Sequence, residues 1–415
     1  MYLDHINIQN FRSFRRSKIS FAYPGQDFKK LGISPPKIKN LNLILGDNGY
    51  GKTSLLRAIA LACLGPVVSK SGLYPYRLIR REPAGKEDSG NKTISGMEAF
   101  AEIEADFVVS SESTSTQEHL GSNVQVHANK DLEVLEWRGA GNTLWDEIYS
   151  ESSHALFVVG YGAGRRVDLK EAKDLGRRRV FARVQRIQSL FEDSYALMPL
   201  SGWLPQLRRR NRFAEVVELI NRLMGRGHYT FTGVMRGGEY LFERGGLEVP
   251  YPALSDGYRA FLGWIGDLLY HIYKTIPNNR PLAEARGIVM VDEIDLHLHP
   301  KWQMTILPTL AAALPNVQFI VTSHSPLLVG SVELGNIISM KEDRKNQASR
   351  LVRLNEPVHG LDADQVLLTD YFGLKSSRAA GRDHVLKKLT IKARSGDEEA
   401  AMELLNTLAH GTEKV

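Results

Sequence analysis

The chain has 415 residues and is poor in the features that mark secreted and membrane proteins. Its single cysteine, Cys63, excludes a disulfide framework and a cysteine-based zinc site. No run approaches the roughly 18 to 20 apolar residues that a membrane span requires, and the N-terminus lacks the layout of a signal peptide. We therefore expect a protein of the reducing cytoplasm that has no membrane partner.

Internal repeats and sustained heptads are also missing, so a long coiled-coil arm is not expected. The composition of 43% hydrophobic and 24% charged residues is typical of a folded globular protein. Lys and Arg exceed Asp and Glu by 53 to 47, a net charge of +6. The excess is local, because residues 165–226 hold fifteen Lys or Arg against seven Asp or Glu and the rest of the chain is slightly acidic.

Hydrophobic periodicity indicates strands and helices along most of the chain, which is typical of an α/β protein. We expect four parts: an N-terminal lobe (1–165), a basic helical insertion (166–228), a second lobe (229–355) and a mostly helical tail (356–415).

Within these parts, several elements can be predicted individually. A helix is expected over residues 53–65, ended by Gly65 and Pro66. Residues 123–137 are predicted as one strand that follows a polar turn, and a further helix is expected from Pro300. Two strands, 229–235 and 239–249, are predicted to pair through Gly237 and Gly238.

The strongest functional signal is the run GDNGYGKT at residues 46–53, which fits the phosphate-loop pattern G-x-x-x-x-G-K-[ST]. Glycines let backbone N–H groups turn toward phosphate oxygens, and the following helix presents its positive dipole end. Lys52 would reach the β- and γ-phosphates, and the Thr53 hydroxyl would ligate Mg²⁺. The alternative is a glycine-rich turn without a ligand, but the run lies between a buried strand and a helix. The residues expected to bind the nucleotide are Gly46, Asn48, Gly49, Gly51, Lys52, Thr53 and Ser54.

A second signal is the apolar strand GIVMV, which ends in Asp292 and Glu293. Asp292 would hold Mg²⁺, directly or through water. Glu293 would polarise the attacking water, since a carboxylate accepts its proton. Two acids at the end of a strand can also be an ordinary solvated turn.

Two further motifs are weaker when each is taken alone. Ser255, in the run LSDGYR, stands where a helix N-cap belongs, and the free N–H groups behind it, near Gly257, make an anion site. A plain helix cap is the alternative. His324, in TSHSP, could donate to a γ-phosphate, although a lone histidine there is more often a polar turn residue.

Taken together and in this order, the four motifs resemble those of the ATP-binding-cassette ATPases. The resemblance implies a P-loop fold of the ABC type, with a mixed sheet and an antiparallel β subdomain. The resemblance implies an enzyme that binds ATP and Mg²⁺, with Lys52, Glu293 and His324 in catalytic roles. It implies a homodimer or higher homo-oligomer in which Ser255 of one copy caps the γ-phosphate held by Lys52 of another. Asp295 falls where the family's D-loop crosses that interface.

The start of the chain, INIQNFRSF, and the runs DEIDLHLHP and TSHSPLL resemble the RecF, SMC and OLD-like group. In that group Arg12 would lie close to the bound nucleotide; a solvated arginine at a strand end is the alternative. OLD-type nucleases carry a C-terminal Toprim domain, for which the tail after Pro357 is too short. We read Asp362 and Asp364 as a helix start and expect no nuclease within the chain.

Looser motifs resemble the ATPase subunits of Septu-type antiphage systems: FVVGYGAGRR, RIQSLFED, GWLPQL and GLDADQVLLTDYFGLKSSR. This resemblance implies that the ATP state gates a separate HNH-type nuclease subunit, with the tail as a docking region. The alternative is a RecF-like repair ATPase that binds DNA without a dedicated nuclease.

The basic segment suits phosphate contacts with DNA. The alternatives are a solvated helical lid and an acidic partner protein, and Arg165 and Arg166 could instead face the nucleotide. The candidates for DNA contact are Arg177, Arg178, Arg208, Arg209 and Arg210.

Overall fold

The computed structural model describes residues 1–68, 71, 77–81, 100–110, 117–129, 132–139, 143–150, 153–167, 182–208, 212–225, 229–376 and 380–410. These residues form two compact units, Met1–Gly360 and Leu361–Val415. The finer division into four parts stays a prediction.

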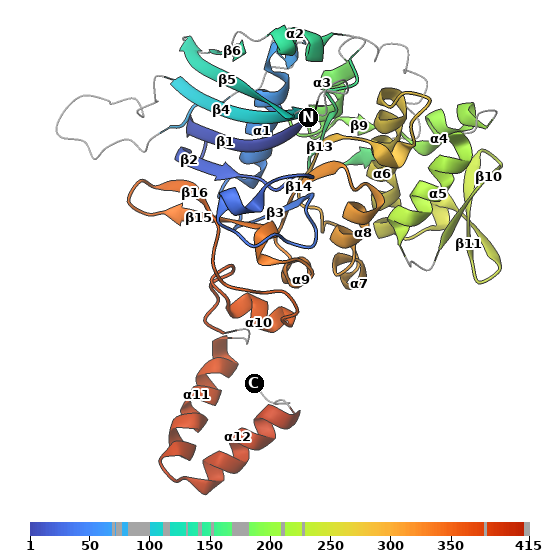
Figure 1. Cartoon of the computed structure of the whole chain (residues 1–415). Helices are drawn as coiled ribbons and strands as arrows, with labels where there is room; N and C mark the ends of the chain where they lie inside the picture. The colour runs from blue at the N-terminus through green and yellow to red at the C-terminus, as the bar shows by residue number, and fades with distance from the viewer. Residues whose placement is uncertain are drawn as a thin grey trace. The chain divides into compact units, whose positions relative to one another are not determined.

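The larger unit is built on a sheet that, in the described residues, has eleven strands in the order β6-β5-β4-β1-β2-β16-β15-β3-β14-β13-β7 (Figure 1). Its parallel part is almost wholly buried, as continuous apolar runs require. β3 pairs in parallel with β14 and β15, and β13 pairs in parallel with β14 and β7. The bounds are β3 (Leu41–Leu45), β7 (Val158–Tyr161), β13 (Gly287–Val291), β14 (Val317–Ser323) and β15 (Ile337–Asp343).

The other half of the sheet is antiparallel from β6 to β2, and β16 joins it to β15. The hairpin of β15 and β16 was not predicted from the sequence. The prediction of one strand over residues 123–137 was wrong: the chain reverses between Asn129 and Leu132, which pair with each other. The bounds are β1 (Tyr2–Phe11), β2 (Phe14–Ser20), β4 (Phe100–Ser110), β5 (Gln117–Asn129), β6 (Leu132–Gly139) and β16 (Ala348–Val352).

Helix α1 (Lys52–Val68) packs on β4, β5, β6, β7 and β14, and it continues beyond the predicted end at Gly65. Pro66 has no N–H to donate to the Ala62 carbonyl, a loss that normally breaks a helix. Here the Ser122 hydroxyl donates to that carbonyl instead, at 2.8 Å. A tertiary contact therefore replaces the missing helical hydrogen bond.

The segment expected as a helical insertion contains strands as well, and it packs into the main unit. α3 contacts β7 and α1, while α5 contacts α8 and β10. The short strands β8 and β9 pair in parallel. The bounds are β8 (Arg166–Val167), α3 (Ala182–Gln188), β9 (Ala196–Leu197), α4 (Leu200–Trp203) and α5 (Arg212–Met224).

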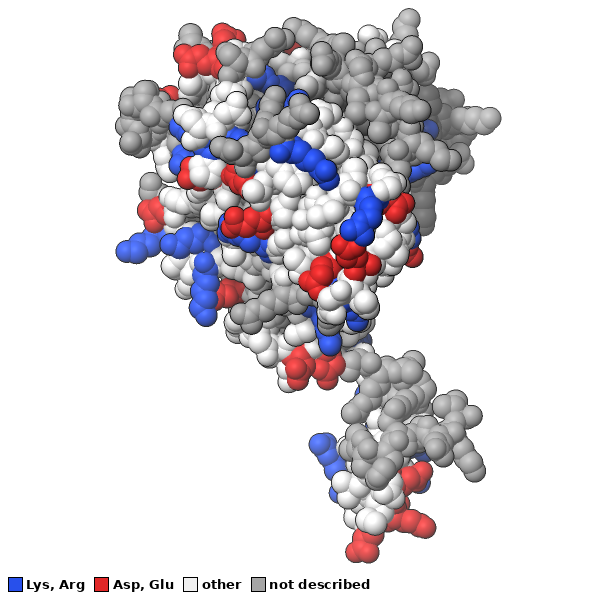
Figure 2. All heavy atoms as spheres, turned by 90° about the vertical axis from the view of Figure 1, so that its right-hand side faces the viewer, with Lys and Arg blue, Asp and Glu red and all other residues white. Residues whose placement is uncertain are grey.

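Several arginines of this basic segment hold the fold together. Their guanidinium groups donate to backbone carbonyls: those of Tyr149 and Ser150 for Arg183, Leu156 for Arg186, Pro277 and Arg280 for Arg212, and Ala312 for Arg222. Figure 2, which views the side of α4 and α5, shows Lys and Arg interspersed with Asp and Glu. Part of the local excess of arginine therefore makes hydrogen bonds within the protein.

The predicted hairpin after residue 229 has a third strand, because Gly245 and Gly246 turn the chain again. The helix expected from Pro300 is interrupted at Met304 and Thr305. The bounds are β10 (Thr230–Arg236), β11 (Glu239–Arg244), β12 (Leu247–Pro250), α2 (Thr143–Tyr149), α6 (Asp256–Thr275), α7 (Pro300–Gln303), α8 (Ile306–Ala313) and α9 (Pro326–Gly330). Short 3-10 helices span Phe28–Leu31, Leu204–Leu207, Tyr251–Ala253, Leu282–Glu284 and Leu334–Asn336.

The smaller unit contains α10 (Ala363–Leu368), α11 (Ala380–Arg394) and α12 (Glu398–His410). Asp362 and Gln365 form a capping box at the start of α10, so Asp362 begins a helix, as its sequence position indicates. α11 and α12 pack on each other. No helix in the described part of either unit is long and apolar enough to cross a membrane.

Candidate nucleotide site

The parallel strands deliver four sets of predicted residues to one edge of the sheet. The phosphate loop follows β3, His324 follows β14, Asp292 and Glu293 follow β13, and Arg165 follows β7. The carboxyl ends of neighbouring parallel strands meet at the same edge, where ligands bind in open α/β sheets.

The phosphate loop is shaped by a neighbouring turn. Gly51 has a φ of +93°, and a Cβ there would lie 2.0 Å from Ser13 Oγ. The Ser13 hydroxyl donates to the Tyr50 carbonyl at 3.2 Å. Arg12, in the same turn, has a φ of 49° and donates its N–H to the Leu78 carbonyl. The β1–β2 turn therefore packs against the loop, and this places Arg12 close to the residues expected to hold nucleotide.

Lys52 begins α1 and is buried. Its Nζ donates to the Gly46 carbonyl at 2.8 Å and to the Asp47 carbonyl at 3.2 Å. Burial lowers the pKa of Lys52, although the carboxylates of Asp292 and Glu293 oppose the shift. The ammonium is thus held inside the loop and lies within the field of the acidic strand end.

Asp292 joins the phosphate loop to the strand next to it. The Thr53 hydroxyl donates to Asp292 Oδ2 at 2.5 Å, and the Thr322 hydroxyl donates to Asp292 Oδ1 at 2.6 Å. These hydroxyl and carboxylate oxygens fit Mg²⁺, which prefers such ligands. Bound there, the ion would neutralise phosphate charge.

The backbone of Glu293 is held by hydrogen bonds at both its N–H and its carbonyl. Its N–H donates to the Thr322 hydroxyl at 2.8 Å, and its φ is 47°, a left-handed conformation that is uncommon outside glycine. Arg165 Nη2 donates to the Glu293 carbonyl at 2.8 Å. Thr322 therefore contacts the backbone N–H of Glu293, and Arg165 contacts its carbonyl.

His324 contacts Lys52 directly, with 2.5 Å between Nε2 and Nζ. Lys52 is a donor, so Nε2 must accept and His324 carries its own proton on Nδ1. Burial and then the charge of Lys52 lower the pKa of His324. Burial and Lys52 thus both favour the neutral imidazole, which lies beside the loop where a γ-phosphate is expected.

Asp295 lies near the same cluster, since its charge acts on Lys52, Arg165 and His324. Its Oδ1 is buried and has no hydrogen-bond partner among the described residues. Ser255 is exposed at the start of α6 and caps nothing with its side chain. A Cβ on Gly257 would lie 2.6 Å from the His297 carbonyl, so α6 begins against the loop that follows Asp295.

Of the arginines predicted to contact DNA, the structure describes only Arg208. Arg208 is exposed after the short helix Leu204–Leu207. Arg177, Arg178, Arg209 and Arg210 lie outside the described residues.

Comparison with known proteins identifies the family. The family described as "AAA domain, putative AbiEii toxin, Type IV TA system" matches residues 41–330, and a second, "AAA ATPase domain", matches residues 1–66. The chain belongs to this AAA ATPase family. The α/β ATPase fold predicted from the motifs is thereby confirmed.

Two relatives extend the comparison of this AAA ATPase. Septu protein PtuA of Bacillus mycoides is 26% identical over 383 residues, which cover 90% of this chain and 45% of the relative. Retron Vc95 probable ATPase of Vibrio cholerae is 22% identical over 390 residues, covering 80% of this chain and 74% of the relative. The chain thus spans less than half of the Septu protein. The solved SMC head domain from Thermotoga maritima covers 86% of this chain at 16% identity, with a TM-score of 0.46.

Thr322 lies in the candidate site of this AAA ATPase, hydrogen-bonded to Asp292 and to the Glu293 N–H, and motif reasoning did not assign it. The sequence shows only a threonine near the end of an apolar strand, two residues before His324. The structure buries Thr322 completely, and a buried hydroxyl needs a hydrogen-bond partner. A polar residue at the end of a largely apolar strand is the one sequence signal that points to such a partner. Which partner it takes depends on the pairing of β14 with β13.

Proposed function

We propose that the chain binds ATP with Mg²⁺ and hydrolyses it at the edge of the sheet after β3, β13 and β14. The observation that carries this proposal is the continuous series of hydrogen bonds from Thr53 through Asp292 and Thr322 to the backbone of Glu293. It joins the residue expected at the metal to the residue expected at the water.

In this proposal each residue has one role. Lys52 and the N–H groups of the loop bind the phosphates. Thr53 and Asp292 hold Mg²⁺, Glu293 takes a proton from the attacking water, and His324 contacts the γ-phosphate.

We further propose that the working form is a head-to-tail homo-oligomer. Ser255 is exposed and leaves the N–H groups at the start of α6 without a side-chain cap. An uncapped helix start of this kind can bind the γ-phosphate of a second copy. Asp295, next to the start of α6, would cross the same interface.

We propose that this ATPase controls a separate HNH-type nuclease in antiphage defence. The support is its similarity to proteins named Septu protein PtuA and retron ATPase, together with the motifs that resemble Septu ATPase subunits. Cleavage would then depend on the ATP state of the complex. Arg208 and the neighbouring arginines would contact the DNA.

The docking region that we propose is the helical hairpin of the smaller unit. Large apolar side chains are exposed there: Ile391 by 70%, Met402 by 62% and Leu405 by 61%. Met402 and Leu405 are three residues apart and share one face of α12. Such a face suits a protein partner better than solvent.

Co-expression with an HNH-type endonuclease, if one is encoded beside this gene, tests the proposal. We expect the nuclease to co-purify and its cleavage of plasmid DNA to change with ATP. Charged substitutions Ile391→Glu and Leu405→Glu should abolish co-purification, whereas Leu132→Glu, at a leucine 74% exposed on β6, should not. Binding of DNA junctions by the chain without any nuclease partner would instead favour a RecF-like repair ATPase.

A further inference from the structure

Arg165 is the charged residue that follows β7, the strand that pairs with β13 at the edge of the sheet. The Asp292 N–H donates to the Tyr161 carbonyl at 2.8 Å, so β7 continues alongside the acidic strand end. Only the turn 162–164 separates Tyr161 from Arg165. The position of Arg165 is therefore set by the same pairing that places Asp292.

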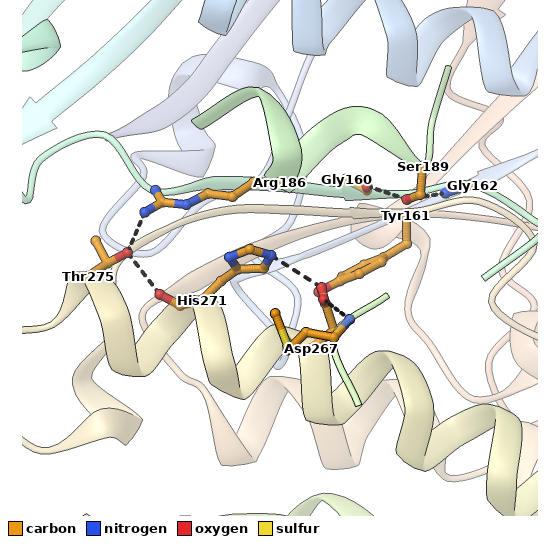
Figure 3. A network of polar contacts seen from close by, with 9 residues as sticks. Gly160, Tyr161, Gly162, Arg186, Ser189, Asp267, His271 and Thr275 are labelled. Atoms are coloured by element: carbon orange, nitrogen blue, oxygen red, sulfur yellow. Dashed lines mark hydrogen bonds and ion pairs between the residues drawn. The ribbon is translucent and has the colours of Figure 1, made fainter. Parts of the chain in front are cut away.

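The turn before Arg165 is held tightly. A Cβ on Gly162 would lie 2.1 Å from the Ser189 carbonyl, so no other residue fits without displacing backbone. The Ser189 hydroxyl donates to the Gly160 carbonyl at 3.0 Å and accepts from the Gly162 N–H at 3.3 Å (Figure 3). These contacts hold the backbone that leads from β7 to Arg165.

The guanidinium of Arg165 lies among the acidic residues after β13. Nη2 donates to the Glu293 carbonyl at 2.8 Å, while Nη1 is shielded from solvent and has no hydrogen-bond partner among the described residues. Burial lowers the pKa of Arg165 to about 10, with Asp292, Asp295 and Glu293 opposing the shift. The group therefore remains a cation at neutral pH.

The backbone of Glu293 needs such a contact. A non-glycine residue with a φ of 47° is strained, and strain of this kind persists only when its surroundings hold it. Thr322 holds the Glu293 N–H, and Arg165 holds its carbonyl. These two contacts hold the backbone from which the Glu293 carboxylate extends.

We infer that Arg165 is a positioning residue for Glu293, holding the backbone of the proposed general base and balancing the charge of the carboxylates around it. This inference rests on the proposed ATP hydrolysis and adds a residue that the four motifs do not contain. We expect Arg165 to affect the chemical step of hydrolysis and not the binding of nucleotide, which the phosphate loop provides.

The test compares Arg165→Ala and Arg165→Lys with the wild-type chain. Displacing a catalytic group by about 1 Å can reduce a rate by about 100-fold, so we expect a loss of that order in kcat for Arg165→Ala. Binding of ATP, measured by calorimetry, should stay within about threefold, because the phosphate loop is unchanged. Arg165→Lys should recover part of kcat, since lysine keeps the charge and a donor.

Added ethylguanidinium gives a readout that a purely structural role would not move. It should raise kcat of Arg165→Ala by at least about tenfold, because it restores the missing cation in the space left by the side chain. Arg166→Ala, at the exposed neighbouring arginine, is the matched control and should behave as wild type.

Several outcomes would overturn the inference. These are an unchanged kcat in Arg165→Ala, a loss of ATP binding that matches the loss of rate, or no recovery with ethylguanidinium. If Arg165→Ala does not fold, Arg165→Lys is measured in its place. A wild-type kcat in Arg165→Lys, or a loss of its affinity for ATP, then contradicts the inference. A wild-type chain that does not hydrolyse ATP would count against the proposed function itself.

Discussion

At the scale of single residues, Thr322 connects the two acids of the site. Its hydroxyl donates to Asp292 and accepts from the Glu293 N–H, and the side chain is fully buried. Neither contact can be replaced by water at such a position. The residue therefore links the proposed metal ligand to the proposed base.

Thr322→Val keeps the shape of the side chain and removes both hydrogen bonds. We expect the free energy of unfolding to fall by about 1–3 kcal/mol, because a buried N–H loses its partner. We expect kcat for ATP hydrolysis to fall at least about tenfold, since Glu293 loses one of its two backbone contacts. Urea unfolding and steady-state hydrolysis measure the two effects. Thr322→Ser retains the hydroxyl, and equal losses in both variants would show that the hydroxyl is not responsible.

Motif reasoning could reach Lys52, Thr53, Asp292 and His324 because phosphate and metal binding restrict residue types at fixed spacing along the chain. The roles of Thr322 and Arg165 depend on which strands pair. Tyr161 and Thr322 flank the end of β13 through the pairings of β7 and β14 with it, a relation that no local pattern contains.

At the scale of secondary-structure elements, α6 is anchored to β7 by a buried polar network (Figure 3). Asp267 Oδ2 accepts from the Tyr161 hydroxyl at 2.8 Å and lies 3.3 Å from His271 Nε2. Asp267 Oδ1 accepts from the Met198 N–H at 2.8 Å. The helix that begins at Ser255 is thereby tied to the strand that leads to Arg165.

This network predicts a pH dependence of stability. Burial alone would raise the pKa of Asp267, but His271, the Met198 N–H and the Tyr161 hydroxyl outweigh it and lower the pKa. A carboxyl with a lowered pKa stabilises the fold above its ordinary range and loses this contribution as the pH falls through the folded-state value.

Asp267→Asn should therefore lower the free energy of unfolding by about 1–3 kcal/mol at neutral pH. The difference from wild type should narrow below about pH 4, where the unfolded carboxyl takes up its proton. Denaturant unfolding between pH 3 and 7 measures this. Asp256→Asn, at an exposed position of the same helix, is the control. A difference that is constant with pH would contradict the ionised state of Asp267.

Helices and strands could be predicted where the pattern of residues within the segment itself determines them. The helix after the phosphate loop and the apolar strands β3, β13 and β14 follow from periodicity. The end of α1 could not be predicted, because Ser122, from a distant strand, satisfies the carbonyl that Pro66 leaves free. The same holds for the arginines of the basic segment, whose carbonyl partners lie far away in the sequence.

At the scale of the whole molecule, the proposed head-to-tail pair uses two separate parts of each chain: the phosphate loop, which would hold ATP, and the start of α6, which would cap the γ-phosphate of the other copy. Lys52 lies within the cluster at the sheet edge, whereas Ser255 is exposed at the start of α6. Among the hydrogen bonds of the described residues, none joins Ser255 to the phosphate loop of its own chain. A head-to-tail pair would bring the two parts together.

Mixing two inactive variants tests this arrangement. Lys52→Ala should not bind ATP productively, and Ser255→Arg should block the cap that is offered to the second copy. Each alone should lack hydrolysis, while an equimolar mixture should recover about a quarter of wild-type activity, since half of the pairs contain one complete site of two. A mixture as inactive as its components would argue that the site is complete within one chain.

The most direct test of the central claim is ATP turnover by Glu293→Gln. Glutamine keeps the size of the side chain but cannot accept the proton of water, so kcat should fall by about 100-fold or more. Calorimetric affinity for ATP should remain near wild type. Asp362→Asn, which keeps an N-cap on α10 outside the site, should hydrolyse ATP normally. Turnover at the wild-type rate by Glu293→Gln would contradict the account.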